Sequence, residues 1–320
     1  MRIGFHASHE QLAPSTLLET VQGAQRAGFD AAMCSDHFAP WGLAQGESGH
    51  AWSWLGAALA TTSLRFGVVT APGQRYHPAI IAQAAATLAE MFPGRFWAAL
   101  GSGEAINEHI TGTGWPEKAR REQRLRESAD IMRRLIDGET VDHDGAVVVD
   151  AARVWSRPAA PPPLLGAAVS ADTARWVAEW ADGLITVGTD PDRVAEVVDA
   201  YRDGGGTGVV ALQVHLCLAD SHAEGLAVAA DQWRHATAPA QRVWDITQPE
   251  EFDRLADVGD TDTLESAVVI ESDAERMATR LAELASAGFD ELYLHEVGKD
   301  QQTFLRRAES ELLPALRGKL

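Results

Sequence analysis

Short apolar runs alternate with amphipathic segments along the whole chain. The runs have the length and composition of buried strands, and the segments between them carry apolar residues three and four positions apart, which is typical of helices. Strands that alternate with helices in this way form parallel βα units. Eight such runs predict a (β/α)8 TIM barrel, an α/β fold, and they lie at 2–7, 31–36, 64–71, 95–102, 163–169, 183–188, 209–219 and 291–297.

The amphipathic segments predict the helices of that barrel. Gly follows several of them, where helices commonly stop. The clearest segments are 15–28, 78–92, 121–138, 171–183, 190–206 and 301–318, the last of which closes the barrel.

Two stretches break the alternation. Residues 139–163 read as a short hairpin followed by a Pro-rich return, and residues 236–282 are acidic, with a weak strand-like segment at 268–270. We interpret both as insertions on the barrel, the second forming helices and loops before the eighth strand. The chain contains no internal repeat, and we expect residues 1–320 to form a single domain.

Size and charge narrow the function classes. A chain of 320 residues with 46% apolar residues can bury a large core. Its formal net charge of −19 argues against extended contact with nucleic-acid phosphates or anionic lipid, so a small-molecule partner is expected. The N-terminus has no apolar signal segment and no run reaches the roughly 20 residues of a membrane span, so we expect a soluble, cytoplasmic protein. Cys34 and Cys217 lie in strand-like runs and are expected to be buried, reduced thiols.

A TIM barrel predicts an active site at the carboxyl ends of the strands, where active sites in this fold lie. Polar and titratable residues gather there: His6, Ser8 and Glu10, Asp36 and His37, Thr70, Ser102 and Glu104, and His295 and Glu296.

The pair Asp36–His37 follows the second predicted strand. An imidazole at such a place can take the proton of a substrate hydroxyl, and a neighbouring carboxylate can orient it. His37 or Asp36 could instead cap a helix. A metal site, as in barrel hydrolases, needs a second close ligand pair that the sequence lacks, so no metal is expected. Phe38 and Trp41 could line a flat ligand or serve as packing.

The stretch GSGEAINE follows the fourth predicted strand at 101–108. Its glycines let a ligand approach the backbone beside Ser102. Glu104 could exchange a proton, or it could simply balance the dipole of the helix that starts there. The third loop lies between the predicted strand 64–71 and the predicted helix 78–92. Pro78 suits the first turn of that helix, and we expect Arg75, Tyr76 and His77 to form a rigid loop at the barrel mouth.

Five motifs in this order give the sequence a family resemblance. They are GFHASHEQLAP at 4–14, SDHFAPW at 35–41, the stretch 71–96, GSGEAINE at 101–108 and WPEKARREQRLRES at 115–128. With them the chain resembles the luciferase-like flavin and deazaflavin oxidoreductases, above all the branch of F420-dependent glucose-6-phosphate dehydrogenases. The resemblance is firm over residues 1–190 and looser beyond.

The resemblance implies a role for each matched residue. His37 is the active-site base, Trp41 stabilises the intermediate, Glu104 is an acid near the pyrimidine edge of the cofactor ring, and Glu10 lies in the pocket. Asp36 lies against the ring, with a non-prolyl cis peptide at Val68–Val69 behind it, and the other cofactor-lining residues are Ser102, Gly103 and Asn107.

Two departures from the family pattern bear on the ligands. Asp190 stands about where the sugar-phosphate dehydrogenases carry a lysine, and Ser266 and Asp290 fall on other phosphate-binding positions, so glucose 6-phosphate is not expected to be the substrate. Val169–Ser170 replaces a Gly-Gly turn that contacts the tail phosphate of F420, which favours FMN slightly over F420 as the cofactor.

These observations predict an oxidoreductase that moves a hydride between a flavin-type ring and a small organic substrate. The alternatives are an FMN-dependent monooxygenase that uses oxygen and reduced flavin from a separate reductase, a cofactor carrier without a substrate, and a metal-dependent barrel hydrolase. Relatives usually pair through barrel helices, so a homodimer is expected.

Overall fold

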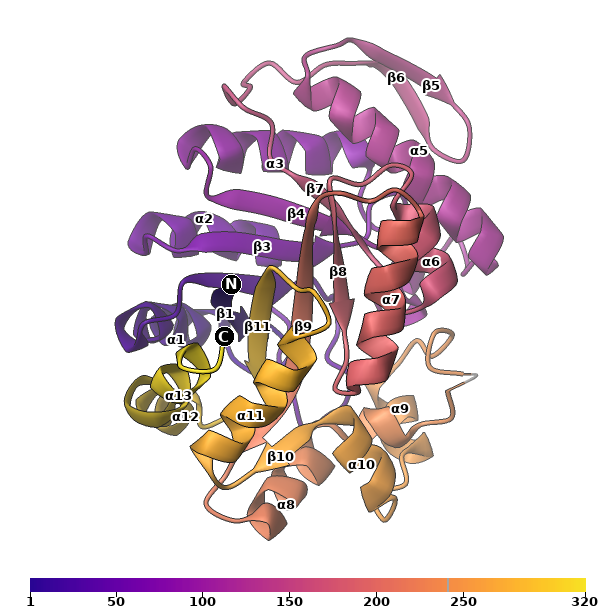
Figure 1. Ribbon diagram of the computed structural model, residues 1–320. Coiled ribbons are helices and arrows are strands. Elements are labelled where there is room, and N and C mark those ends of the chain that lie inside the picture. Colours follow the sequence, from indigo (N-terminus) through magenta and orange to yellow (C-terminus); the bar gives the residue numbers. More distant parts are fainter. Residues whose placement is uncertain (241) are drawn as a thin grey trace.

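Eight parallel strands close into a barrel in the computed structural model, which describes residues 1–240 and 242–320 (Figure 1). The neighbours run in the order β9–β11–β1–β2–β3–β4–β7–β8, and pairing of β8 with β9 closes the ring. This confirms the predicted TIM barrel. The strands are β1 (Arg2–Ala7), β2 (Ala31–Ser35), β3 (Arg65–Thr70), β4 (Phe96–Leu100), β7 (Leu164–Ala167), β8 (Gly183–Val187), β9 (Val209–Leu218) and β11 (Glu291–Glu296).

Helices surround the barrel and confirm the six predicted segments. Pro14 and Pro78 stand in the first turns of their helices, and Gly28 ends α1 in the left-handed conformation. The segment 301–318 contains α12 and α13, joined by a π-helical turn over 308–312. The helix α2 lies where the sequence analysis named no helix. The barrel helices are α1 (Pro14–Ala27), α2 (Ala51–Thr61), α3 (Pro78–Met91), α5 (Lys118–Ile136), α6 (Ala171–Val177), α7 (Pro191–Asp203), α11 (Ala274–Ala285), α12 (Gln301–Arg307) and α13 (Leu313–Arg317).

Two stretches that break the alternation of strands and helices form the expected insertions. The first contains the antiparallel hairpin β5 (Val141–Asp144) and β6 (Val148–Ala152). The second contains α9 (Pro249–Leu255), α10 (Thr261–Ala267) and the short strand β10 (Val269–Glu271), which pairs in parallel with the end of β9. The helix α8 (His222–Gln232) lies before residue 236, outside the predicted range. Because α11 is a regular barrel helix, this insertion ends before residue 274 rather than at 282.

The amino end of the barrel is filled from inside by large rings. The indole of Trp97 and the ring of Tyr293 lie with their centroids 5.8 Å apart and are fully buried. Space for them comes from Gly67 and Gly4, where a Cβ atom would overlap Trp97 and Tyr293 respectively. Below them Glu291 on β11 pairs with Arg2 on β1 and Arg65 on β3. The barrel is therefore a packed core at this end, and its cavity lies at the other.

Both cysteines are free and buried, as the sequence predicted. Among the described helices, none has the length and apolar character needed to span a bilayer.

Candidate active site

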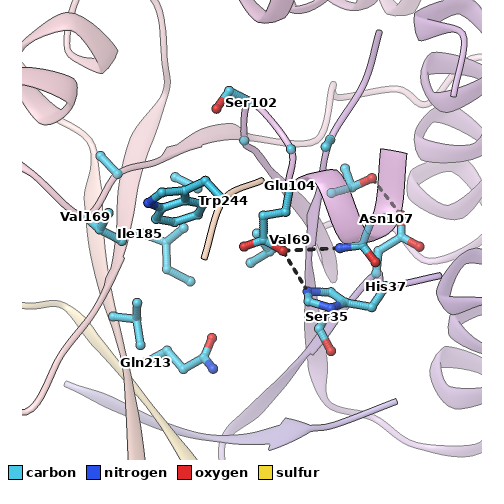
Figure 2. Close-up of a pocket in the computed structure, with 18 of the residues that line it drawn as sticks. Ser35, His37, Val69, Ser102, Glu104, Asn107, Val169, Ile185, Gln213 and Trp244 are labelled. Atoms are coloured by element: carbon cyan, nitrogen blue, oxygen red, sulfur yellow. Dashed lines mark hydrogen bonds and ion pairs between the residues drawn. The ribbon is translucent and has the colours of Figure 1, made fainter. Parts of the chain in front are cut away.

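A pocket of about 550 Å³ opens at the carboxyl ends of the strands. This volume lies within the range of small-molecule and cofactor sites. The pocket brings together nearly all of the predicted site residues, namely Glu10, Asp36, His37, Trp41, Val69, Ser102, Gly103, Glu104, Asn107, Val169 and Ser170. Figure 2 shows several of them, with His37, Glu104 and Asn107 side by side.

His37 lies between two carboxyl groups. Its Nδ1 is 3.4 Å from Glu10 Oε1 and its Nε2 is 3.7 Å from Glu104 Oε2. Nδ1 is buried and makes no hydrogen bond within the described residues, so Glu10 acts on it through charge. A proton gained by this imidazole would therefore lie between two groups able to stabilise it.

The two glutamates are held in different electrostatic environments. Burial opposes ionisation of Glu10, but the charge of His37 and a hydrogen bond from Ser35 outweigh it, and the pKa of Glu10 falls to about 2. Ser8 and Ser35 both donate to its Oε2 at 2.8 Å. Burial raises the pKa of Glu104 above its ordinary value, although His37 pulls in the opposite direction. Glu10 is thus a fixed anion, and Glu104 is the group of the pair that is more readily protonated.

Asp36 anchors this arrangement to the barrel. Its Oδ2 accepts hydrogen bonds from Thr70 at 2.8 Å and from Trp52 at 3.2 Å, and its Oδ1 accepts from Tyr76 at 3.2 Å. Arg75 donates to the Asp36 backbone carbonyl at 2.6 Å and pairs with the carboxylate. The carboxylate therefore ties β2 to α2, β3 and the third loop, which fixes His37 next to it. His77, at the end of this loop, caps α3.

The stretch after β4 supplies the opposite wall. Asn107 donates to Glu104 Oε2 at 3.2 Å and accepts from the Phe38 backbone at 2.8 Å, so it links the two loops. Gly103 adopts φ 84°, and a Cβ there would lie 3.0 Å from the Glu108 side chain. This position therefore requires glycine.

Two expectations about the cofactor side of the pocket are wrong, both at Val68–Val69. Val68 does not line the pocket because side chains alternate along β3: Val69 faces the cavity, and Val68 packs against the helices. The peptide between Val68 and Val69 is trans, since both residues pair in regular register with β2 and β4. Phe38 lies outside the pocket and is 55% exposed.

The predicted phosphate positions are also misplaced. Asp190 caps α7 and does not line the pocket. Asp290 precedes β11 at the amino end of the barrel, where it accepts from the Val210 backbone. Ser266 does not line the pocket either, and its carbonyl accepts from Thr189. Glu296 likewise turns away from the cavity, toward the backbone of Leu218 and Gly298.

His6, Trp41 and His295, which the sequence analysis named, belong to a cluster of rings whose other members, His215, Trp233 and His235, it missed. Trp41 stacks on His235 at 5.1 Å, Trp233 lies 4.5 Å from His215, and His295 stacks on His6 at 4.2 Å. Burial lowers the pKa of His6 to about 3 and that of His215 to about 4, so these imidazoles are neutral near pH 7. Gln213 and His215 alternate within an otherwise apolar run, which was the signal for inward-facing polar positions.

The pocket fits a flat tricyclic ring of the flavin type. Val69, Ala167 and Ile185 form an apolar surface, and polar groups of Ser35, Ser102 and Asn107 lie around it (Figure 2). Lys118 and Arg121 at the start of α5 add positive charge to the rim, suited to an anionic tail. Within the described residues no group of three or more His, Cys, Asp or Glu side chains is arranged to hold a metal ion.

Comparison with known proteins identifies relatives over the full chain. Residues 1–291 match the family model described as luciferase-like monooxygenase. An F420-dependent glucose-6-phosphate dehydrogenase of Beutenbergia cavernae is 33% identical, covering all of this chain and 98% of the relative, and one of Mycobacterium tuberculosis is 32% identical, covering 99% and 98%.

Solved structures agree with the sequence relatives. An F420-dependent secondary alcohol dehydrogenase in complex with an F420-acetone adduct superposes with a TM-score of 0.91 at 28% identity, covering 99% of each chain. The monooxygenase RslO1 from Streptomyces bottropensis, at 19% identity and a TM-score of 0.70, shares the fold. The resemblance seen in the sequence is confirmed, and this chain belongs to the luciferase-like family of flavin- and F420-dependent oxidoreductases.

Proposed function

We propose that the protein transfers a hydride between a bound flavin-type ring and the carbon of a small alcohol or carbonyl compound, with His37 exchanging the substrate proton. The observation that carries this proposal is the position of the His37 imidazole between Glu10 and Glu104 inside the pocket. When bound, the cofactor supplies the redox chemistry.

The residues around His37 have separable tasks. Nε2, on the side of Glu104, is the nitrogen that accepts the proton of a substrate hydroxyl. The anionic Glu10 stabilises the resulting positive charge from the Nδ1 side, and Trp41, whose ring centroid lies 5.0 Å from that of His37, presents a π face to the same charge. Glu104 holds or returns a proton at the edge of the ring site.

His37→Ala tests this role. Cofactor affinity should remain within about twofold, while kcat should fall by roughly 10²–10⁴, the usual contribution of a general base. His222→Ala, at an exposed surface position, is the control. A variant that loses cofactor binding but keeps its turnover per bound cofactor would show that His37 is a binding residue only.

The cofactor is proposed to be FMN or F420, which share the ring system that the pocket suits. The F420-dependent relatives favour F420. Val169 and Ser170, which replace the Gly-Gly turn, favour FMN, and Ser170 here caps α6. A fluorescence titration with both cofactors in one buffer decides between them. Preference for FMN together with oxygen uptake coupled to substrate oxidation would indicate the monooxygenase alternative and a separate reductase.

Glucose 6-phosphate is proposed not to be the substrate. The wall formed by β9, β11 and residues 233–235 contributes Gln213, His215, Trp233, His235 and His295 to the pocket. Arg234 does not line the pocket and is paired with Asp231 and Asp253. Arg75 is already paired with Asp36 and Glu108. A sugar phosphate would therefore meet no free cation on this wall. Rapid reduction of the cofactor by glucose 6-phosphate would refute this part of the proposal.

We also propose that two copies of the chain form a homodimer through α2 and α3. The outward positions of α2 are small and uncharged, and those in the first three turns of α3 are Ile80, Gln83, Ala84 and Thr87. Because each chain carries a formal charge of −19, two copies approach with least repulsion at an uncharged face.

A further inference from the structure

Gln213 is a pocket residue to which the proposed reaction assigns no role. It lies on β9, and Figure 2 shows its side chain reaching into the pocket near Ile185. Its amide nitrogen lies 3.2 Å from His215 Nε2 and 3.3 Å from His295 Nδ1. The protonation of these two imidazoles decides what the Gln213 amide can offer to a ligand.

A backbone carbonyl fixes the tautomer of His295. Gln11 Nε2 donates to the carbonyl of Val297, which can only accept, so the oxygen of Gln11 faces His295. His295 Nε2 lies 2.8 Å from that oxygen and must carry the hydrogen. Burial holds the pKa of His295 well below its ordinary value, so the ring is neutral and has one N–H. Its Nδ1 is therefore an acceptor.

The amide nitrogen of Gln213 then sets the tautomer of His215. Burial lowers the pKa of His215 to about 4, so this ring too is neutral and has one N–H. Because the nitrogen that donates to His295 Nδ1 also faces His215 Nε2, that Nε2 is an acceptor and the hydrogen of His215 lies on Nδ1.

Two acceptors therefore converge on one amide. The NH₂ group of Gln213 has two hydrogens, and each imidazole takes one. The reverse orientation would place the amide oxygen against two nitrogen lone pairs, which is repulsive. The oxygen Oε1 is thus turned away from the histidines, and within residues 1–240 and 242–320 no hydrogen bond reaches it. The Gln213 Oε1 atom is not fully shielded from solvent, so it remains accessible from the pocket.

We propose that Gln213 Oε1 accepts a hydrogen bond from a second hydroxyl group of the substrate, distinct from the hydroxyl whose proton passes to His37. This inference rests on the proposed function, which it extends to a substrate class: an uncharged diol or polyhydroxylated compound. No Lys or Arg of the surrounding wall lines the pocket, which fits a neutral ligand. Because its N–H donors are held by two histidines, Gln213 cannot turn its amide to donate a hydrogen bond to a substrate carbonyl instead of accepting one from a hydroxyl.

Calorimetric titration of the cofactor-saturated protein tests the proposal. The probes are cyclohexanol and its 1,2-, 1,3- and 1,4-diols, which vary the distance to the second hydroxyl. At least one diol should bind about tenfold more tightly than cyclohexanol. Gln213→Leu should abolish this preference, and Gln302→Leu, at an exposed position of α12, should keep it. If no diol binds more tightly than cyclohexanol, the proposal is wrong.

A measurement on the unmutated protein checks the two histidine tautomers, and with them the orientation of the Gln213 amide. In ¹⁵N spectra of histidine-labelled protein, His295 should be the Nε2–H tautomer and His215 the Nδ1–H tautomer. An Nδ1–H tautomer of His295 would direct the amide oxygen of Gln213 to the histidines and overturn the inference. Diol preference without cofactor reduction by any alcohol would support the role of Gln213 while contradicting the proposed reaction, so the two failures are distinguishable.

Discussion

At the scale of single residues, His9 is a buried imidazole with an energetic cost. It is fully buried, neither ring nitrogen has a hydrogen-bond partner in the described part of the chain, and its ring meets Trp54 edge-on at 5.0 Å. Burial lowers the pKa of His9 to about 4. The His9 side chain is therefore neutral in the folded protein. Its buried nitrogens without hydrogen bonds lower the free energy of unfolding.

The depressed pKa of His9 predicts a pH dependence of stability. Between about pH 4 and the ordinary histidine pKa near 6.5, the unfolded chain binds a proton that the folded chain excludes. Its contribution therefore makes the free energy of unfolding fall as the pH decreases, by up to ~1.4 kcal/mol per pH unit. His9→Phe should make the slope between pH 5 and 6.5 shallower by up to that amount, as measured by urea denaturation.

His222→Phe is the matched control, because His222 lies at the surface, paired with Glu265. It should leave the slope nearly unchanged. An identical slope in His9→Phe and the unmutated protein would mean that His9 does not titrate differently in the two states.

At the scale of elements, β3 depends on a residue that lacks a side chain. Gly67 on β3 faces Trp97 on β4, and the indole occupies the space of the missing Cβ. The Trp97 ring on β4 thus fills the space beside β3 that a side chain at position 67 would otherwise occupy. Such complementarity leaves no room for relaxation without moving a strand.

Gly67→Ala should therefore lower the free energy of unfolding by about 3 kcal/mol, at the upper end of typical overpacking costs. Gly56→Ala on α2 is the contrasting change, since a Cβ there would meet no atom within 4 Å. It should stabilise the protein by about 0.5–1 kcal/mol, because alanine is the better helix former. Thermal and urea unfolding of both variants measure the difference. Equal effects of the two changes would contradict the packing described for the barrel interior.

At the scale of the whole molecule, the uncharged faces of α2 and α3 predict the assembly. Ile80 is 58% exposed on the outer face of α3. Ile80→Glu would bury a charge at a dimer interface and should shift the mass measured by light scattering from two chains to one. The control Val258→Glu changes an exposed apolar residue elsewhere and should keep two chains. A mass of one chain for the unmutated protein would refute the dimer.

The general features of the site were predictable because they follow from strand order. Parallel strands bring their carboxyl ends to one rim, so His37, Glu10 and Glu104 meet there although they are far apart in sequence. The individual orientations were not predictable. Val68 and Glu296 lie at the carboxyl ends of their strands but point away from the cavity. Which side chains of a strand face inward is set by its register with the neighbouring strands.

The barrel, its two insertions and the family could be predicted before folding was considered, because the alternation of apolar runs and helical segments is local and each of the five motifs is contiguous. The electrostatic state of the pocket depends on contacts that exist only in the folded protein. Glu10 is held ionised by His37 and Ser35, and the Gln213 amide is oriented by the Val297 backbone carbonyl acting through Gln11 and His295. Burial and hydrogen bonding set these states, and both arise from residues that meet only after the barrel has closed.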